Sequence, residues 1–116
     1  MRQRLLPLLL IVLVTIPAVA GTVTVVEDSS AASWSSAEYQ LDNAVPSFQV
    51  CGTGFSGTVV FKQGLKSGKL VATRTLTLSS YTGCTEYYQE LPSTVAQLTG
   101  TRSAGTVTVY FDWYKP

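Results

Sequence analysis

Acid–base chemistry in this 116-residue chain would have to come from carboxylates, because the chain contains no histidine. A hydrolytic triad then has no base, which leaves a pair of Asp or Glu side chains as the route to proton transfer. The carboxylates are Glu27, Asp28, Glu38, Asp42, Glu86, Glu90 and Asp112. They lack the spacing of a calcium-binding loop, and the sequence has no nucleophile-elbow, phosphate-loop or nucleotide motif. We therefore expect a non-enzymatic protein with no catalytic residue, cofactor or metal.

Cys51 and Cys84 are the two cysteines of the chain. In a small exported domain an even number of cysteines indicates a disulfide. A redox or metal-binding pair is the alternative, and a metal would find no histidine ligand here. We predict a structural Cys51–Cys84 bridge. It would close a loop of about 34 residues, which the chain-entropy model values at roughly 3.8 kcal/mol.

Aromatic side chains are the feature of this sequence that suggests binding. The tryptophans and tyrosines are Trp34, Tyr39, Tyr81, Tyr87, Tyr88, Tyr110, Trp113 and Tyr114. Flat rings on a β-sheet can stack on sugars or anchor a protein partner. Alternation along the last predicted strand turns Tyr110 and Tyr114 outward. We expect these two tyrosines to contact a partner or a sugar.

The first twenty residues have the pattern of a secretory signal peptide. Arg2 and Arg4 precede an apolar core, and Ala18-Val19-Ala20 is a small-x-small cleavage site. A transmembrane anchor is the alternative, but spanning needs about 20 apolar residues and this core is shorter and contains two prolines. We predict cleavage after Ala20, which leaves residues 21–116 as one secreted domain.

Composition narrows the class of this domain. Without Arg2 and Arg4 the formal net charge changes from +1 to −1, and no basic run remains to bind nucleic acid. We also expect no membrane partner after cleavage. Thr, Ser, Gly and Val dominate, and no stretch beyond residue 20 has a sustained apolar period of 3.6 residues. These features are typical of a small all-β domain.

Short alternating stretches separated by turn residues define the elements that must position these side chains. The expected strands are residues 22–26, 34–42, 47–51, 58–63, 70–78, 84–91, 94–99 and 106–114. About seven to eight such strands favour a single antiparallel two-sheet β-sandwich or jelly-roll-like domain. In the last strand we expect a buried face of Val107, Val109, Phe111 and Trp113. The outward face is expected to contain Thr106, Thr108, Tyr110, Asp112 and Tyr114.

The hexapeptide AGTVTV occurs at residues 20–25 and 104–109, with a near copy, SGTVVF, at residues 56–61. We interpret it as a turn followed by a half-buried strand, because Gly suits the turn and Thr and Val prefer extended backbone. The first copy would begin the mature chain. It can pair within its own domain or add to the open edge of a neighbour. This candidate assembly strand consists of Gly21, Thr22, Val23, Thr24, Val25 and Val26.

Two stretches, FSGTVVFKQGLKSGKLVATRTLTL and LTGTRSAGTVTVYFDW, resemble small β-sandwich domains of tailed-phage and prophage virion proteins. The resemblance covers residues 35–113. It implies a jelly-roll-like module used in virion structure or attachment, without catalysis. Such domains usually lack an export signal, so the signal shifts the expected role toward a secreted or cell-surface subunit.

Two functions follow from these observations. The first is a secreted, non-enzymatic structural or assembly protein, the subunit of an extracellular filament, surface coat or virion-like appendage. Its partner would be another copy of itself or another surface protein. The alternative is a secreted module that binds carbohydrate, such as a polysaccharide, or another surface through exposed aromatics.

Overall fold

The computed structural model describes residues 20–115, and nearly all of the predicted signal peptide lies outside this part. The described chain folds into six strands and no helix. The strands are β1 (Ala20–Ser29), β2 (Ser33–Ser35), β3 (Tyr39–Gly64), β4 (Val71–Cys84), β5 (Tyr88–Gln89) and β6 (Ser93–Tyr114). Accordingly, residues 20–115 include no helix that could span a membrane.

The strands form one antiparallel sheet in the order β1-β6-β3-β4, with β2 added to β6 and β5 added to β3. Its centre is the long ladder between β3 and β6, which runs from the pair Val45 and Tyr114 to the pair Gly64 and Val95. β1 and β4 are the outer strands, and the sheet is not closed. The all-β class and the antiparallel sheet predicted from the sequence are confirmed.

β3 and β6 are much longer than the sequence predicted, because two glycine-rich segments bend the strands instead of ending them. Residues 52–57 and 100–105 were expected as turns, and this was wrong. The ladder shifts register between Thr53 and Ser56, and Gly54 and Gly105 adopt φ values of 60° and 74°. A β-carbon at Gly105 would lie 2.2 Å from the carbonyl oxygen of Gly54. The two backbones therefore approach each other so closely at this point that a side chain would not fit.

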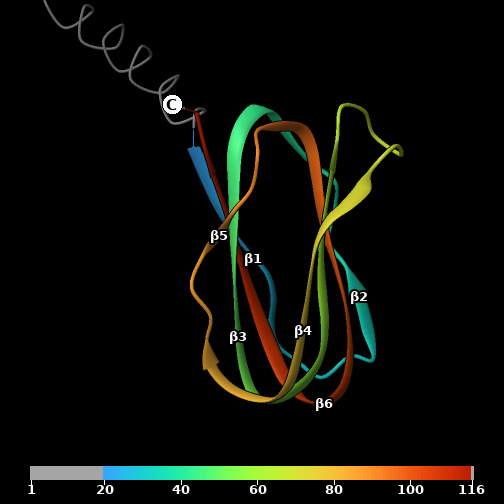
Figure 1. Ribbon diagram of the computed structural model, residues 1–116, viewed down its shortest axis with the longest axis vertical. Helices are drawn as coiled ribbons and strands as arrows, with labels where there is room; N and C mark the ends of the chain where they lie inside the picture. Colours follow the sequence, from blue (N-terminus) through green and yellow to red (C-terminus); the bar gives the residue numbers. More distant parts are fainter. Residues whose placement is uncertain (1–19, 116) are drawn as a thin grey trace, which may run out of the picture.

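The bends bring the two halves of the long strands face to face (Figure 1). Phe48 and Phe61 belong to opposite halves of β3, yet their ring centroids lie 5.6 Å apart. Phe61 also lies 6.1 Å from Phe111 of β6. One apolar core therefore fills the space between the halves. Its largest fully buried side chains are Phe48, Phe55, Phe61, Phe111, Leu98, Val50, Val59, Val95, Val107 and Val109.

The predicted alternation of β6 holds with one exception. Val107, Val109 and Phe111 are buried, and Trp113 packs against the core from its end. Thr108 was expected on the exposed face but is buried. Its Oγ1 accepts a hydrogen bond from the backbone N–H of Asp28 at 2.9 Å, because the register shifts in β1 bring that residue over it.

Each tryptophan lies across a glycine of the neighbouring strand. Trp34 of β2 is the register partner of Gly100, and Gly21 of β1 is the partner of Trp113. A β-carbon at Gly100 would come within 2.3 Å of the Trp34 ring, and one at Gly21 within 2.1 Å of the Trp113 ring. These glycines thus provide the space in which the indoles lie flat against the adjacent strand.

Candidate ligand-binding face

One outward face of the sheet gathers tyrosines around a carboxylate. Residues 110, 112 and 114 of β6 share this face because strand side chains alternate. Asp112 lies between Thr22 of β1 and Ser47 of β3, which are its register partners. We call the set Thr22, Ser47, Tyr87, Tyr110, Asp112 and Tyr114 the tyrosine face.

Tyr87 joins this face from the segment before β5. Tyr88 turns inward and packs against Phe48, with ring centroids 5.6 Å apart, so its neighbour Tyr87 points to the other side. Partial burial raises the pKa of Tyr87, and the nearby Asp112 and Tyr110 add to this rise. Asp112 and Tyr110 therefore lie close enough to Tyr87 to act on the charge of its phenol.

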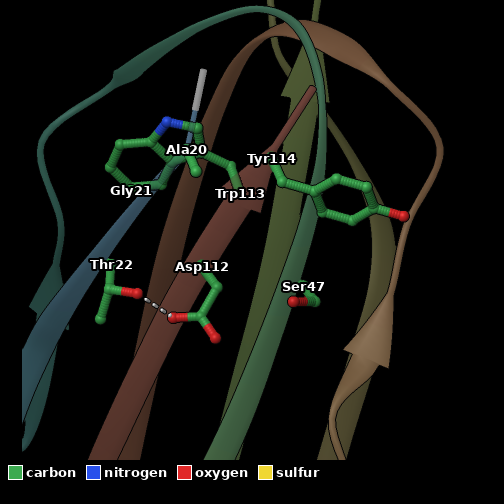
Figure 2. A pocket seen from close by; sticks show the side chains of 7 residues that line it. All are labelled: Ala20, Gly21, Thr22, Ser47, Asp112, Trp113 and Tyr114. Carbon is green, nitrogen blue, oxygen red and sulfur yellow. Dashed lines mark hydrogen bonds between the residues drawn. The ribbon is translucent and has the colours of Figure 1, made fainter. Parts of the chain in front are cut away.

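A shallow hollow of about 510 Å³ lies at the end of the tyrosine face where β1 begins and β6 ends (Figure 2). It is lined by Ala20, Gly21, Thr22, Ser47, Asp112, Trp113 and Tyr114. The Thr22 hydroxyl donates to Asp112 Oδ1 at 2.9 Å. None of the lining residues is a lysine or arginine that would neutralise Asp112. The hollow therefore combines an aromatic ring, a carboxylate and hydroxyl groups.

The predicted contact residues differ in accessibility. Tyr114 is 48% exposed, as expected for a contact residue. Tyr110 is less accessible, because its side chain is half-buried. Tyr87, which is also 48% exposed, carries no local sequence signal that marks it as a contact residue. Asp112 and Ser47 were likewise not predicted as binding groups. The alternation of β6 placed Asp112 outward, but only the cross-strand register reveals Ser47 beside it.

The Cys51–Cys84 disulfide is confirmed. The two residues are register partners on β3 and β4 with Cα atoms 4.0 Å apart. The bridge lies near the bend of β3 and joins it to the end of β4. It therefore links the central ladder to an outer strand and contributes no group to the tyrosine face.

The candidate assembly strand lies within β1 and pairs with β6 of the same chain. Gly21, Val23 and Val26 have Trp113, Phe111 and Val109 as partners. Val23, Val25 and Val26 all pack against the core, and a register shift between Thr24 and Val26 brings the last two inward together.

The remaining carboxylates are dispersed, and two of them form ion pairs. Asp42 accepts a bond from Lys115 at 2.6 Å, and Glu90 pairs with Arg74. Lys115 lowers the pKa of Asp42 through this hydrogen bond and its charge. Among residues 20–115 no three Cys, Asp or Glu side chains lie close enough to hold a metal ion.

No protein-family model matches this chain, and no curated protein matches it significantly. Among solved structures it is similar to the SPBc2 prophage-derived protein YomS, with a TM-score of 0.57 and 13% identity over 81% of this chain and 91% of that one. At this identity the likeness concerns the fold alone.

Two further structures are less similar. The first is chitosan-binding module 1 of a chitosanase/glucanase from Paenibacillus sp. IK-5, with a TM-score of 0.46 and 14% identity over 82% of this chain and 92% of that one. The second is PirA, with a TM-score of 0.40 and 10% identity over 83% of this chain and 93% of that one.

Proposed function

We propose that this protein is a secreted, non-enzymatic module that binds a glycan chain on its tyrosine face. The observation that carries the proposal is the grouping of Tyr87, Tyr110 and Tyr114 around Asp112 on one open sheet surface. Tyrosine rings offer apolar faces on which the C–H side of a sugar can stack, and their hydroxyls remain available for hydrogen bonds. Asp112 and Ser47 add an acceptor and a hydroxyl for sugar hydroxyls.

The shape of the site favours an extended ligand. Deep, enclosed cavities suit small molecules, whereas this hollow is shallow and continues into the surface bearing Tyr110 and Tyr87. The predicted cleavage after Ala20 removes one residue from the rim and leaves the other six lining residues. A linear polysaccharide can then lie along the face and contact several rings in turn.

We further infer that the folded sheet is a jelly-roll-like sandwich and that the protein is exported. The contact between the two halves of β3 supports the first inference, and the likeness to YomS in fold agrees with it. The predicted leader and the Cys51–Cys84 bridge support the second, because disulfides persist in oxidising compartments.

The test is binding of the mature, oxidised protein to immobilised polysaccharides of different sugar composition. We expect at least one polysaccharide to retain the protein. Tyr114→Ala or Tyr87→Ala should weaken this binding roughly tenfold, as for an exposed aromatic anchor. Tyr81→Ala is the control, because Tyr81 is a tyrosine of β4, paired with Phe55 and outside the tyrosine face. The proposal is contradicted if no polysaccharide retains the protein, or if the tyrosine-face variants bind as well as the parent protein.

A second candidate is a structural subunit of a filament, coat or virion-like appendage. It is favoured by the open sheet, in which β1 and β4 are outer strands whose backbone can pair with another chain. Electron microscopy of the native secreted material distinguishes the two: ordered polymers support assembly. Deleting residues 21–26 then separates a donated strand from an internal one. Soluble subunits that no longer polymerise indicate donation, and a lower melting temperature alone indicates internal pairing.

A further inference from the structure

Large apolar side chains are exposed where β3 turns into β4. Leu65 is 81% exposed and Val71 is 64% exposed. Leu91, on the loop before β6, is 78% exposed. Gln63 relates the three residues: Val71 is its register partner, its side-chain amide donates to the backbone carbonyl of Leu91 at 2.9 Å, and Leu65 follows two residues later in the chain. We call residues 62–71 with Leu91 the hairpin tip.

The hairpin tip is also the most basic part of the described chain. Lys62, Lys66 and Lys69 lie within eight consecutive residues. One carboxylate, Glu38, reaches the tip, and its Oε2 accepts a hydrogen bond from the backbone N–H of Gly68 at 3.3 Å. The charge of the tip is therefore positive, and the cations flank exposed apolar groups.

The exposure of Leu65 belongs to an ordered turn. The backbone N–H of Lys69 donates to the carbonyl of Lys66 at 3.1 Å, and Gly68 supplies the left-handed conformation with φ of 78°. Gln40 Nε2 donates to Ser67 Oγ at 3.2 Å and braces the turn from outside. The fold thus holds a leucine outward between lysines instead of folding it onto the core.

We propose that the hairpin tip docks on the surface of an anionic phospholipid bilayer. A soluble polyanion would need only the lysines, and an apolar protein groove would need only Leu65 and Val71. A bilayer interface accepts both, because leucine enters the acyl boundary while lysine stems reach the lipid phosphates. This contact needs no spanning segment. It adds a membrane surface as a partner, whereas the sequence led us to expect no membrane partner after cleavage. It is independent of glycan binding by the tyrosine face.

The test uses the mature, oxidised protein and vesicles of phosphatidylcholine alone or of equal parts phosphatidylcholine and phosphatidylglycerol. We expect sedimentation with the anionic vesicles only. Lys66→Gln and Lys69→Gln should each weaken partitioning about fivefold, the effect of about one unit charge near an anionic surface. Leu65→Ser should weaken it roughly tenfold, even at low salt.

A fluorescent substitution reports insertion directly. Leu65→Trp should show a blue-shifted emission on anionic vesicles, whereas Thr75→Trp on exposed β4 is the control and should not shift. Tyr114→Ala should leave vesicle binding unchanged, which separates this site from the glycan site. No sedimentation with anionic vesicles overturns the proposal. Loss with the lysine variants but not with Leu65→Ser also overturns it, because the protein would then be adsorbed by charge alone.

Discussion

The contact between Trp34 and Gly100 predicts that the variant Gly100→Ala is less stable than the parent protein. The new β-carbon would lie 2.3 Å from Trp34 Cζ2 and 2.4 Å from Cε2, so the ring or the strand must move by more than 1 Å to restore ordinary contact. Overpacking of this kind costs about 1–3 kcal/mol. The alanine also reduces the conformational freedom of the unfolded chain, which stabilises the folded state by about 0.4–1 kcal/mol. We expect a net loss of about 1–2 kcal/mol.

The ring has little room to escape. Trp34 lies at the centre of β2, whose neighbours Ser33 and Ser35 pair with β6. Just beyond them, the backbone N–H of Ser36 donates to the Leu98 carbonyl at 2.8 Å. Moving β2 away from Gly100 therefore means breaking these backbone hydrogen bonds. Removing the indole with Trp34→Ala should reverse the sign of the glycine substitution, making Gly100→Ala neutral or stabilising by up to about 1 kcal/mol in that background.

The assay is a double-mutant cycle by urea unfolding and thermal melting. In a domain of this size each kcal/mol lowers the melting temperature by about 4–8 °C. Gly54→Ala is the matched control, because Gly54 has φ of 60° and no atom within 4 Å of its virtual β-carbon. Its cost comes from backbone strain and should be the same with or without Trp34. An equal cost of Gly100→Ala in both backgrounds would refute the reasoning.

Three further predictions concern the bridge, the tyrosine face and the core. Replacing both Cys51 and Cys84 by Ser should lower the free energy of unfolding by roughly 3.8 kcal/mol in the chain-entropy model, measured by urea unfolding; a loss below about 1 kcal/mol would contradict the model. The pKa of Tyr87 is raised above its ordinary value of 10.0, so its contribution to stability is complete below pH 10.0 and is lost as the pH rises through the raised value. An absorbance titration should show one late phenol that disappears in Tyr87→Phe and titrates earlier in Asp112→Asn; identical curves for Asp112→Asn and the parent would exclude the electrostatic contribution. Phe48→Ala should cost about 3–5 kcal/mol in thermal unfolding, and a cost near zero would show that the two halves of β3 do not pack together.

Alternation and composition were enough to predict the class of fold and most of the buried face of β6. Val107, Val109 and Phe111 follow a period of two that depends only on the local sequence. The lengths of β3 and β6 could not be predicted in this way. Gly54 and Gly105 look like ordinary turn residues, and only their contact across the ladder shows that both strands continue through them.

The candidate site was predictable in part. The outward direction of Asp112 and Tyr114 follows from the same alternation, and the predicted bridge follows from cysteine number. Tyr87 and Ser47 reach the tyrosine face through the pairing of β3 with β5 and β6. Register between distant strands depends on bulges and turn geometry along the whole chain, so local patterns do not reveal it.

The pairing of β1 with β6 also sets the order in which this chain can finish folding. Ala20 pairs with Tyr114, so the partner of β1 is made only after nearly all of the described residues. At ribosomal rates of about 5–20 residues per second, the valines of β1 wait roughly 5–20 seconds for that partner. The β3–β4 hairpin has no such delay, because its strands are adjacent in sequence. During this interval β1 is an unpaired apolar strand. Two copies of the chain are therefore most able to exchange β1 while they are newly made.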